Sequence, residues 1–264
     1  MSKKGKLMQN IHFRYDSGNW ITNLYDLKSW RAVAEVEPRS RSDTNKPNSS
    51  PQTTILPVLR FPSNCLRNIN LVTFDPDGDK VKCRYADHRE EECDSPCTPP
   101  PVLSLSSNCT FSFNATSNKT EGLYAVQMVM EDLPRKQITL TQANGPQVVK
   151  TTSDAISRIP IQFGIQVDPV APSCSEGDYL PRFLPPTPEH GSRFSCNVNQ
   201  TLEIKISGIA NQAGTLELLL SGPHNVVKTS SGSGNFYLKW KPSIYDEGPG
   251  HPICFVIQRS DLVF

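Results

Sequence analysis

Residues 160–167 read Pro-Ile-Gln-Phe-Gly-Ile-Gln-Val, with a large apolar side chain at every second position. Successive side chains of a β-strand point to opposite faces of a sheet, so this alternation predicts a strand with one buried face. The same period of two recurs over residues 80–85, 124–131, 202–207 and 236–241. Because helical periodicity is weak and 23 prolines interrupt the chain, the sequence predicts an all-β fold.

The length and charge of the chain limit the number of its domains and the kinds of partner it can bind. Its 264 residues leave room for two domains of roughly 100 residues each. Lysine and arginine number 27 against 26 acidic residues, which gives a net charge of +1. Binding to phosphates needs a concentrated cationic surface, so this balance argues against a nucleic-acid partner. The sequence contains neither a transmembrane stretch nor the apolar run of a signal peptide.

Eight cysteines indicate the redox compartment. A zinc site would need paired elements such as C-x-x-C, and here only two cysteines are close, at C-x-x-x-C spacing. A disulfide framework is therefore favoured over zinc, with reduced core thiols as the remaining alternative. The disulfide candidates are Cys65, Cys83, Cys93, Cys97, Cys109, Cys174, Cys196 and Cys254. Disulfides form in oxidising compartments, so we expect an extracellular or cell-surface protein that is truncated at both ends, with membrane attachment only through missing domains.

Sequons for N-glycosylation support the same location. The pattern N-x-S/T without a middle proline occurs at Asn48, Asn108, Asn114, Asn118 and Asn199. Roughly three such motifs are expected by chance in a chain of this composition, so five is a modest excess. Three of them lie between residues 108 and 118. We expect this edge to carry glycan and therefore not to form a protein interface.

Composition changes along the chain predict its division into parts. Residues 1–37 contain strand-like pieces but are short for a domain, and we expect them to be the remnant of a preceding truncated domain. Residues 38–51 are polar and predict a linker. Residues 52–169 predict one β-sandwich, with a long exposed loop over residues 139–157. Residues 170–264 predict a second β-sandwich, truncated at its C-terminal end.

Two segments resemble known modules. Residues 71–85 read L-V-T-F-D-P-D-G-D-K-V-K-C-R-Y, which resembles the strand–DPDGD–strand signature of cadherin-like sandwiches, and residues 122–132 resemble their later G-x-Y strand. Residues 236–242, with D-x-G and a strand following, are similar to the ending of immunoglobulin-like modules. The combination resembles a segment of large animal ectodomain proteins. The resemblance implies two tandem cadherin-like and immunoglobulin-like sandwiches.

Five cysteines fall in the first predicted sandwich and three in the second. Full oxidation therefore requires at least one bond across the boundary, or a bond that replaces a partner lost by truncation. We expect Cys83, in the strand after DPDGD, to pair with Cys93 or Cys97, and Cys65 to pair with Cys109. Cys174 would pair with Cys254, which leaves Cys196 without an obvious partner.

The DPDGD segment is the candidate metal site. Asp75, Asp77 and Asp79 place three carboxylates at alternate positions, and Ca²⁺ takes 6–8 oxygen ligands in irregular geometry. Further ligands would come from residues 43–48 or from the acidic run 90–92. If the run 90–92 supplies no ligand, we expect it to be solvated. A turn without metal is favoured over calcium, and in this turn the aspartates accept backbone hydrogen bonds and Gly78 adopts a positive φ. No other cofactor is expected.

The sequence offers no catalytic motif. It lacks G-x-S-x-G, H-E-x-x-H and G-x-x-x-x-G-K-[ST], and its five histidines are scattered. The favoured function is a non-catalytic extracellular recognition or adhesion segment that presents loops to a protein or glycan ligand. A structural spacer in a matrix or mucin-like protein is the alternative, and an accessory region of a secreted enzyme is a distant third.

Overall fold

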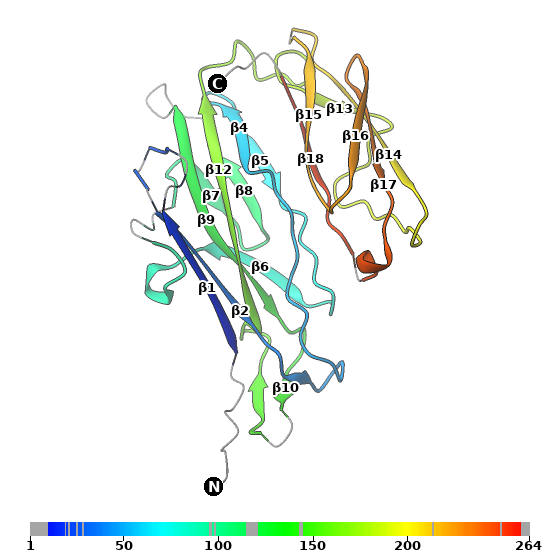
Figure 1. Ribbon diagram of the computed structural model, residues 1–264. Helices are drawn as coiled ribbons and strands as arrows, with labels where there is room; N and C mark the ends of the chain where they lie inside the picture. Colours follow the sequence, from blue (N-terminus) through cyan, green and yellow to red (C-terminus); the bar gives the residue numbers. More distant parts are fainter. Residues whose placement is uncertain are drawn as a thin grey trace. The chain divides into compact units, whose positions relative to one another are not determined.

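The computed structural model describes residues 10–259 except 19, 21, 25, 28, 95, 96, 98, 115–120, 143, 144, 213 and 249. Its regular elements in this part of the chain are strands and two short 3₁₀ helices, η1 (His88–Glu90) and η3 (Ile244–Asp246), so the all-β prediction is confirmed (Figure 1). The chain forms two compact units. The first comprises Met1–Thr53, Pro57–Phe61 and Leu66–Asp168, and the second comprises Thr54–Leu56, Pro62–Cys65 and Pro169–Phe264.

The main sheet of the first unit has the order β1-β2-β12-β9-β6, with each of these neighbours antiparallel, and β4 also pairs with β12 (Figure 1). Its strands are β1 (Ile11–Gly18), β2 (Ser29–Val36), β4 (Val58–Pro62), β6 (Lys80–Tyr85), β9 (Gly122–Leu133) and β12 (Ser157–Asp168). The two long central strands, β9 and β12, pair from Ser157 opposite Asp132 to Val167 opposite Gly122. Every side chain of β9 from position 124 to position 130 is buried, because both faces of this strand are covered.

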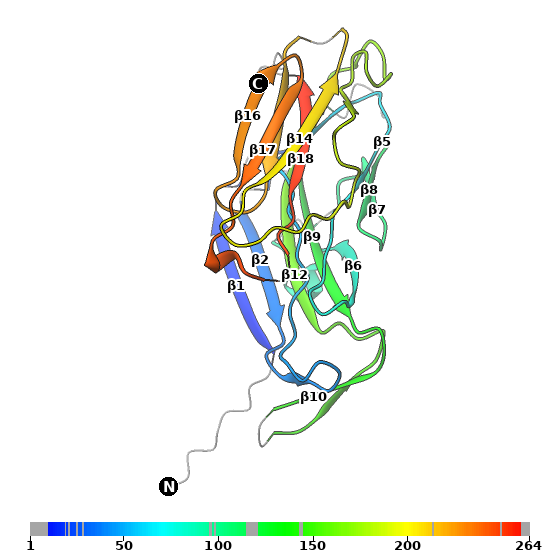
Figure 2. The ribbon, with the colours of Figure 1, turned by 90° about the vertical axis from the view of Figure 1, so that its right-hand side faces the viewer.

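A second sheet of order β5-β8-β7 covers the apolar face of this unit. Its strands are β5 (Arg67–Asn70), β7 (Leu103–Leu105) and β8 (Thr110–Phe113), which Figure 2 shows grouped together. The ring centroids of Phe111 and Phe163 lie 5.2 Å apart edge to face, and those of Phe113 and Phe61 lie 5.2 Å apart in a stack. These aromatic pairs join the two sheets into a sandwich.

The prediction of a long exposed loop over residues 139–157 is wrong. This stretch belongs mostly to a small sheet of order β11-β10-β3, formed by β3 (Ser40–Arg41), β10 (Ile138–Thr141) and β11 (Val148–Lys150). Ile138, Leu140 and Ile156 form a buried cluster beneath it. The strands are too short, and too rich in threonine and lysine, for their alternation to stand out from a polar background.

Two predicted boundaries at the N-terminal end are also wrong. The described part of residues 1–37 is not a remnant of another domain, because β1 and β2 make a hairpin whose second strand pairs with β12 at Arg158 opposite Glu35. Residues 38–51 are not a free linker, because β3 pairs with β10 and the side chain of Arg41 is only 1% exposed. Both segments belong to the first unit.

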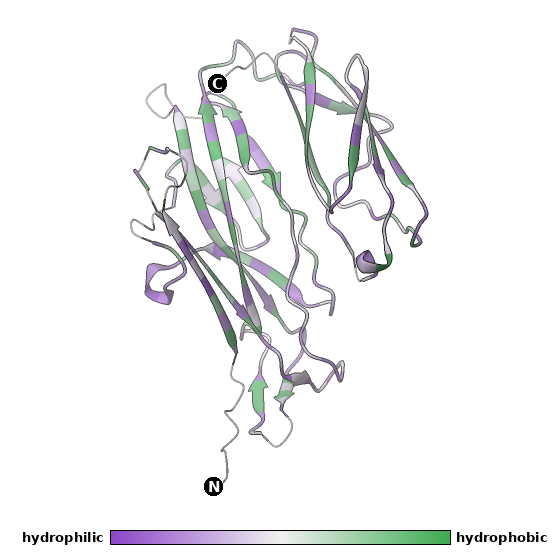
Figure 3. Cartoon of the chain, in the orientation of Figure 1, coloured by the Kyte–Doolittle hydropathy of each residue, from purple (hydrophilic) through white to green (hydrophobic). Residues whose placement is uncertain are grey.

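The second unit has a four-stranded sheet of order β13-β14-β17-β16 and a two-stranded sheet, β15-β18. These strands are β13 (Arg182–Leu184), β14 (Leu202–Ile209), β15 (Leu216–Ser221), β16 (Val227–Gly232), β17 (Asn235–Trp240) and β18 (Cys254–Arg259). Its core consists of Ile204, Ile206, Leu218, Phe236, Leu238 and Ile257. The predicted alternations over 202–207 and 236–241 therefore place their apolar side chains in a core, and Figure 3 shows the alternation as changing colour along the strands.

Candidate functional site

The DPDGD segment forms the tight turn that its sequence predicts. The Oδ1 atom of Asp75 accepts hydrogen bonds from the backbone N–H of Asp77 at 2.9 Å and of Asp79 at 3.0 Å. Gly78 has a φ of +81°, which a residue with a side chain rarely adopts, and its N–H donates to the carbonyl of Asp75 at 3.1 Å. The turn prediction is confirmed, and its hydrogen bonds point the carboxylates inward instead of toward solvent.

The guanidinium group of Arg41 lies against this turn. It donates to both carboxylate oxygens of Asp79, to both of Asp43 at 3.0 Å each, and to Oδ1 of Asn48 at 2.6 Å. Asp77 Oδ2 lies 3.4 Å from Nη1 of Arg41. Burial lowers the pKa of Arg41, but its bonds to Asp79 and Asp43 outweigh this effect and raise the pKa overall. The arginine therefore stays charged and ties residues 41–48 to the turn.

Three carboxylates converge beside this arginine. Asp75, Asp79 and Asp132 each place a carboxylate oxygen so that all three atoms lie within 4.8 Å of one another, and all three residues are buried. Asp132, at the end of β9, accepts bonds from Ser157 N–H at 2.6 Å and from Asn48 Nδ2 at 2.7 Å. We call these three residues the acidic cluster. The acidic cluster differs from the set expected from the sequence, because Asp77 lies outside it and Asp132, which the sequence did not indicate, belongs to it.

Asp75 is the unusual member of the acidic cluster. Its Oδ1 is satisfied by the turn, whereas its buried Oδ2 has no hydrogen-bond partner in the described structure. Burial, together with the nearby charges of Asp132 and Asp79, raises the pKa of Asp75 to about 6. Burial also raises the pKa of Asp132. An orphan buried carboxylate oxygen costs free energy, and a proton or a metal ion would relieve that cost.

The charges around the acidic cluster do not balance. Asp43 and Asp77 lie beside this cluster, and the guanidinium of Arg41 contacts Asp43, Asp77 and Asp79. In the described structure no hydrogen bond or ion pair joins Arg41 to Asp75 or Asp132, the other two members. Lys136 lowers the pKa of Asp43 only weakly, and Arg135 donates to the carbonyl of Gly78 rather than to a carboxylate. Carboxylate oxygens of this kind are the ligands that a hard divalent cation takes. From segment 43–48, Asn48 reaches the acidic cluster through its Nδ2 group, which donates to Asp132.

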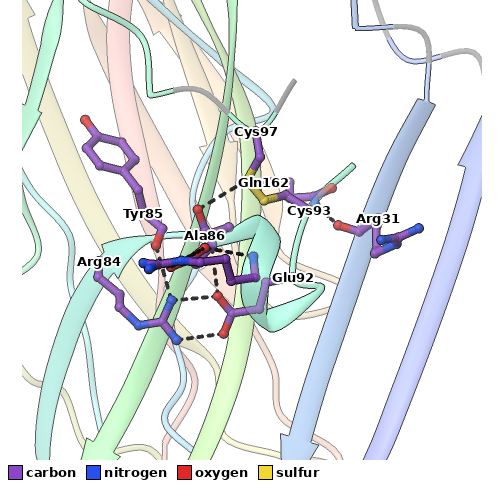
Figure 4. The surroundings of a disulfide bond; sticks show 10 residues. Arg31, Arg84, Tyr85, Ala86, Glu92, Cys93, Cys97 and Gln162 are labelled. Carbon is purple, nitrogen blue, oxygen red and sulfur yellow. Dashed lines mark hydrogen bonds and ion pairs between the residues drawn. A yellow bond between two sulfur atoms is a disulfide. The ribbon is translucent and has the colours of Figure 1, made fainter. Parts of the chain in front are cut away.

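The acidic run 90–92 does not contribute, and its prediction as a solvated run is wrong at Glu92. Glu92 is buried, and its carboxylate accepts two hydrogen bonds from Arg84 at 2.6 Å each, as Figure 4 shows. The backbone N–H of Asp87 donates to the same carboxylate at 3.0 Å. The neighbouring disulfide Cys93–Cys97 is drawn in the same view. This corner is therefore an internally paired structural element.

Six of the eight cysteines form disulfides, namely Cys65–Cys174, Cys83–Cys109 and Cys93–Cys97. The predicted pairings of Cys83 with Cys93 or Cys97, of Cys65 with Cys109 and of Cys174 with Cys254 are wrong. Closeness in sequence was misleading, because Cys83 lies in β6 of one sheet and Cys109 precedes β8 of the covering sheet. The Cys65–Cys174 bond spans the predicted boundary at residue 169, but both of its cysteines belong to the second unit. Cys196 and Cys254 carry free thiols, and burial raises the pKa of Cys254.

The sequons differ in accessibility. Asn108 lies in the exposed turn between β7 and β8, and Asn114 and Asn199 are also exposed. A glycan at Asn48 does not fit this structure, because Asn48 is buried. A glycan would attach to its Nδ2 atom, and this atom donates a hydrogen bond to Asp132. Asn118 lies outside the described residues. The predicted glycan edge therefore keeps two of its three sites in exposed positions.

The β1–β2 hairpin carries an apolar face that sequence analysis overlooked. The register pairs Phe13 with Ala34 and Tyr15 with Ala32, so these side chains share one face. We call this the hairpin face; besides Ser17 it consists of the apolar residues Ile11, Phe13, Tyr15, Trp30, Ala32, Ala34 and Val36. Phe13 is 58% exposed and Tyr15 64% exposed, and the ring of Tyr15 lies 5.1 Å from that of Trp30. Alternation over residues 11–15 was a signal that could have found it.

The opposite face of the same hairpin is polar. Asp16 pairs with Arg14 at 2.5 Å and with Arg31 at 2.6 Å, and Glu35 pairs with Arg158 at 2.7 Å across to β12. Ion pairs of this kind suit a solvated surface. The hairpin is thus strongly two-sided, with charges on one side and exposed aromatic rings on the other.

No protein-family model matches the sequence, and no curated protein matches it. Among solved structures, the chain is similar to extracellular domains 3–5 of Drosophila OTK, with 10% identity over 87% of this chain and 69% of that one, at a TM-score of 0.23. It is also similar to the eight N-terminal immunoglobulin domains of Down Syndrome Cell Adhesion Molecule. The identity is 9% over 97% of this chain and 31% of that one, at a TM-score of 0.23.

An endo-fucoidan hydrolase of glycoside hydrolase family 107 also matches, with 14% identity over 94% of this chain and 37% of that one, at 0.27. At these TM-scores none of the three bears on what this chain does. Among the described residues, none of the helices has the length and apolar character needed to cross a membrane.

Proposed function

We propose that this chain is a non-catalytic extracellular segment that recognises a protein or glycan partner. The observation that carries this proposal is the hairpin face, where Phe13 and Tyr15 are more than half exposed beside Trp30. Contiguous exposed apolar side chains on a folded domain mark interaction sites, because leaving them in water costs free energy. Aromatic side chains are also the commonest anchors of protein interfaces.

The location outside the cytosol rests on the disulfides. Three bonds link Cys65, Cys83, Cys93, Cys97, Cys109 and Cys174. Structural disulfides persist in oxidising compartments and are rare in the cytosol. The exposed sequons at Asn108, Asn114 and Asn199 support the same location. Cell-surface adhesion is the setting in which a recognition segment of this kind would act.

A binding experiment separates recognition from the structural-spacer alternative. The full chain, expressed in secretory cells and tetramerised on a carrier, is titrated onto cell surfaces, and saturable binding is expected. The double variant F13S/Y15S should lose most of this binding. Y245S, which removes a side chain 94% exposed in the second unit, serves as the matched control and should bind normally. Absence of saturable binding, or equal binding by F13S/Y15S, would support the spacer instead.

We also propose that Asp75, Asp79 and Asp132 hold Ca²⁺. Support comes from the buried, unpartnered Oδ2 of Asp75, which offers a ligand atom beside two further carboxylates. Ca²⁺ prefers carboxylate and carbonyl oxygens and tolerates irregular coordination. Binding of Ca²⁺ would join the DPDGD turn to the end of β9 and so stiffen the first unit.

A further inference from the structure

The first strand of the chain is an open edge. β1 pairs with β2 along all eight of its residues, from Ile11 opposite Val36 to Gly18 opposite Ser29. On its other side, no strand among the described residues pairs with it. An edge strand leaves a row of backbone N–H and C=O groups available to a second strand. β1 contains no proline and no lysine, the residues that commonly block such pairing.

The pattern of β1 restricts how a second strand could align with it. Odd-numbered residues face the apolar side and even-numbered residues the charged side. In a pairing of β1 with a second β1, an odd residue must lie opposite an odd residue, because a slip of one position would set aromatic rings among charges. In an antiparallel pairing about a two-fold axis, the numbers of two directly opposed residues always add to the same sum. The rule is satisfied when this sum is even.

The charges of Arg14 and Asp16 favour one of the registers that have an even sum. With Tyr15 opposite Tyr15 of a second copy, Arg14 of each copy lies opposite Asp16 of the other. Shifting the axis by one residue toward either end sets Arg14 opposite Arg14, or Asp16 opposite Asp16. Cross-strand pairs of opposite charge stabilise a sheet and like charges directly opposite destabilise it. The neighbouring register centred on Phe13 gains no Arg14–Asp16 pair.

We propose that two copies of this chain associate by antiparallel β1–β1 pairing centred on Tyr15. The pairing joins the two main sheets into one and places the two hairpin faces side by side, so that Phe13 and Tyr15 of both copies form one apolar surface. The interface is self-complementary, as a two-fold dimer requires. This inference rests on the proposed recognition function and names its partner as a second copy of the chain.

A charge exchange tests the register. Each of R14D and D16R sets like charges opposite each other in a self-pair, so each variant alone should weaken dimerisation by at least tenfold. In a mixture of the two, every cross-strand pair at positions 14 and 16 joins opposite charges, so association should return. The molar mass of the full secreted chain, measured by light scattering across concentrations, reports the outcome. Thermal midpoints within a few degrees of the wild type confirm that each variant is folded.

A cysteine placed on the axis gives an independent test. Opposed residues in an antiparallel pair have Cα atoms about 4.5 or 5.5 Å apart, within the range of a disulfide. Y15C should therefore form a disulfide-linked dimer under mild oxidation. S17C is the matched control, because position 17 lies opposite Phe13 of the other copy and should cross-link far more slowly. The wild-type chain, with its thiols at Cys196 and Cys254, sets the background.

The outcomes separate the dimer from the recognition function. A wild-type chain that remains monomeric at the highest soluble concentration overturns the dimer, as does equal cross-linking of Y15C and S17C or failure of the mixed variants to associate. If such a monomer still binds cells saturably, the recognition function stands with another partner. If the dimer forms but no saturable binding to cells is seen, the dimer stands and the recognition function fails.

Discussion

The guanidinium of Arg41 donates to both carboxylate oxygens of Asp79, although 38 residues separate them in the chain. The two side chains are 1% and 4% exposed. This bond holds the polar segment around Arg41, which follows the β1–β2 hairpin in the chain, against the turn that precedes β6. Because the pair is buried, each member depends on the other for its charge to be compensated.

Replacing Arg41 should therefore be strongly destabilising. R41M leaves the buried carboxylate of Asp79 uncompensated and removes the bonds to Asp43 and Asn48. Loss of one partner of a buried ion pair costs about 3 to 5 kcal/mol of unfolding free energy. Denaturant titration of the full chain measures the change. The control is R89M, since Arg89 forms an exposed pair, and it should leave the denaturation midpoint unchanged.

Stability should depend on pH through Asp75. The pKa of Asp75 is raised to about 6 in the folded state, against about 3.9 when unfolded, so the folded chain binds more protons between these values. The free energy of unfolding should therefore rise as pH falls from above 6 to about 4, by up to about 3 kcal/mol. D75N should lose the part of this rise that comes from Asp75, while the part from Asp132, whose pKa burial also raises, should remain. D75N should also be more stable than the wild type at pH 7 without metal. An unchanged slope in D75N would contradict the assignment.

Calcium should stabilise the first unit. Millimolar Ca²⁺ should raise the thermal midpoint, and a concentration ten times the dissociation constant adds about 1.4 kcal/mol. D75N and D132N should abolish the rise, whereas D77N should keep it, because Asp77 lies outside the acidic cluster. An unshifted midpoint with flat titration calorimetry would leave the segment as a turn alone. Loss of the response in D77N but not in D132N would instead return the ligand set to the consecutive aspartates.

The Cys83–Cys109 bond should be a major source of stability. It joins β6 to the covering sheet across 26 residues. In the chain-entropy model a loop of this length is worth about 3 to 4 kcal/mol, so C83A/C109A should be destabilised by that order. C196S should have little effect, because its thiol is free. Non-reducing peptide mapping that links Cys83 to Cys93 or Cys97 would contradict this pairing.

Glycan mapping should separate the sequons. Secreted protein should carry glycan at Asn108, Asn114 and Asn199, and none at Asn48, whose side chain bonds Arg41 and Asp132. N48Q should be destabilised by about 1 to 3 kcal/mol, because it disturbs buried polar partners. N108Q should lose one glycan with little change in unfolding. Occupancy at Asn48 in folded protein would require this segment to open before glycosylation.

The sequence was sufficient to predict those strands in which large apolar residues alternate. β9, β12, β14 and β17 lie within or around the expected stretches because burial of one face dominates their pattern. β3, β10 and β11 were missed because these strands are short and their few apolar residues are mixed with threonine, serine and lysine. The β1–β2 hairpin was visible as strand-like, but its attachment to β12 depends on residues more than 100 positions away.

The acidic cluster was only partly predictable for a similar reason. Asp75 and Asp79 are joined by a local turn, which consecutive residues specify. Asp132 enters through the pairing of β6 with β9, a contact that no local pattern reports. Arg41 looked like a linker residue because Asp79, the partner on the DPDGD turn against which it is buried, lies 38 positions further along the chain. A charged residue reads as exposed until its counter-ion is known.

The Cys65–Cys174 bond, whose cysteines are 109 positions apart, has a consequence for proteolytic cleavage. A single protease cut anywhere between these cysteines, for example in the exposed turn after β11, severs the polypeptide without releasing either piece. The nicked chain would run as one band until a reductant is added and as two bands afterwards. Shedding of either half therefore requires reduction of this bond or a cut on its outer sides.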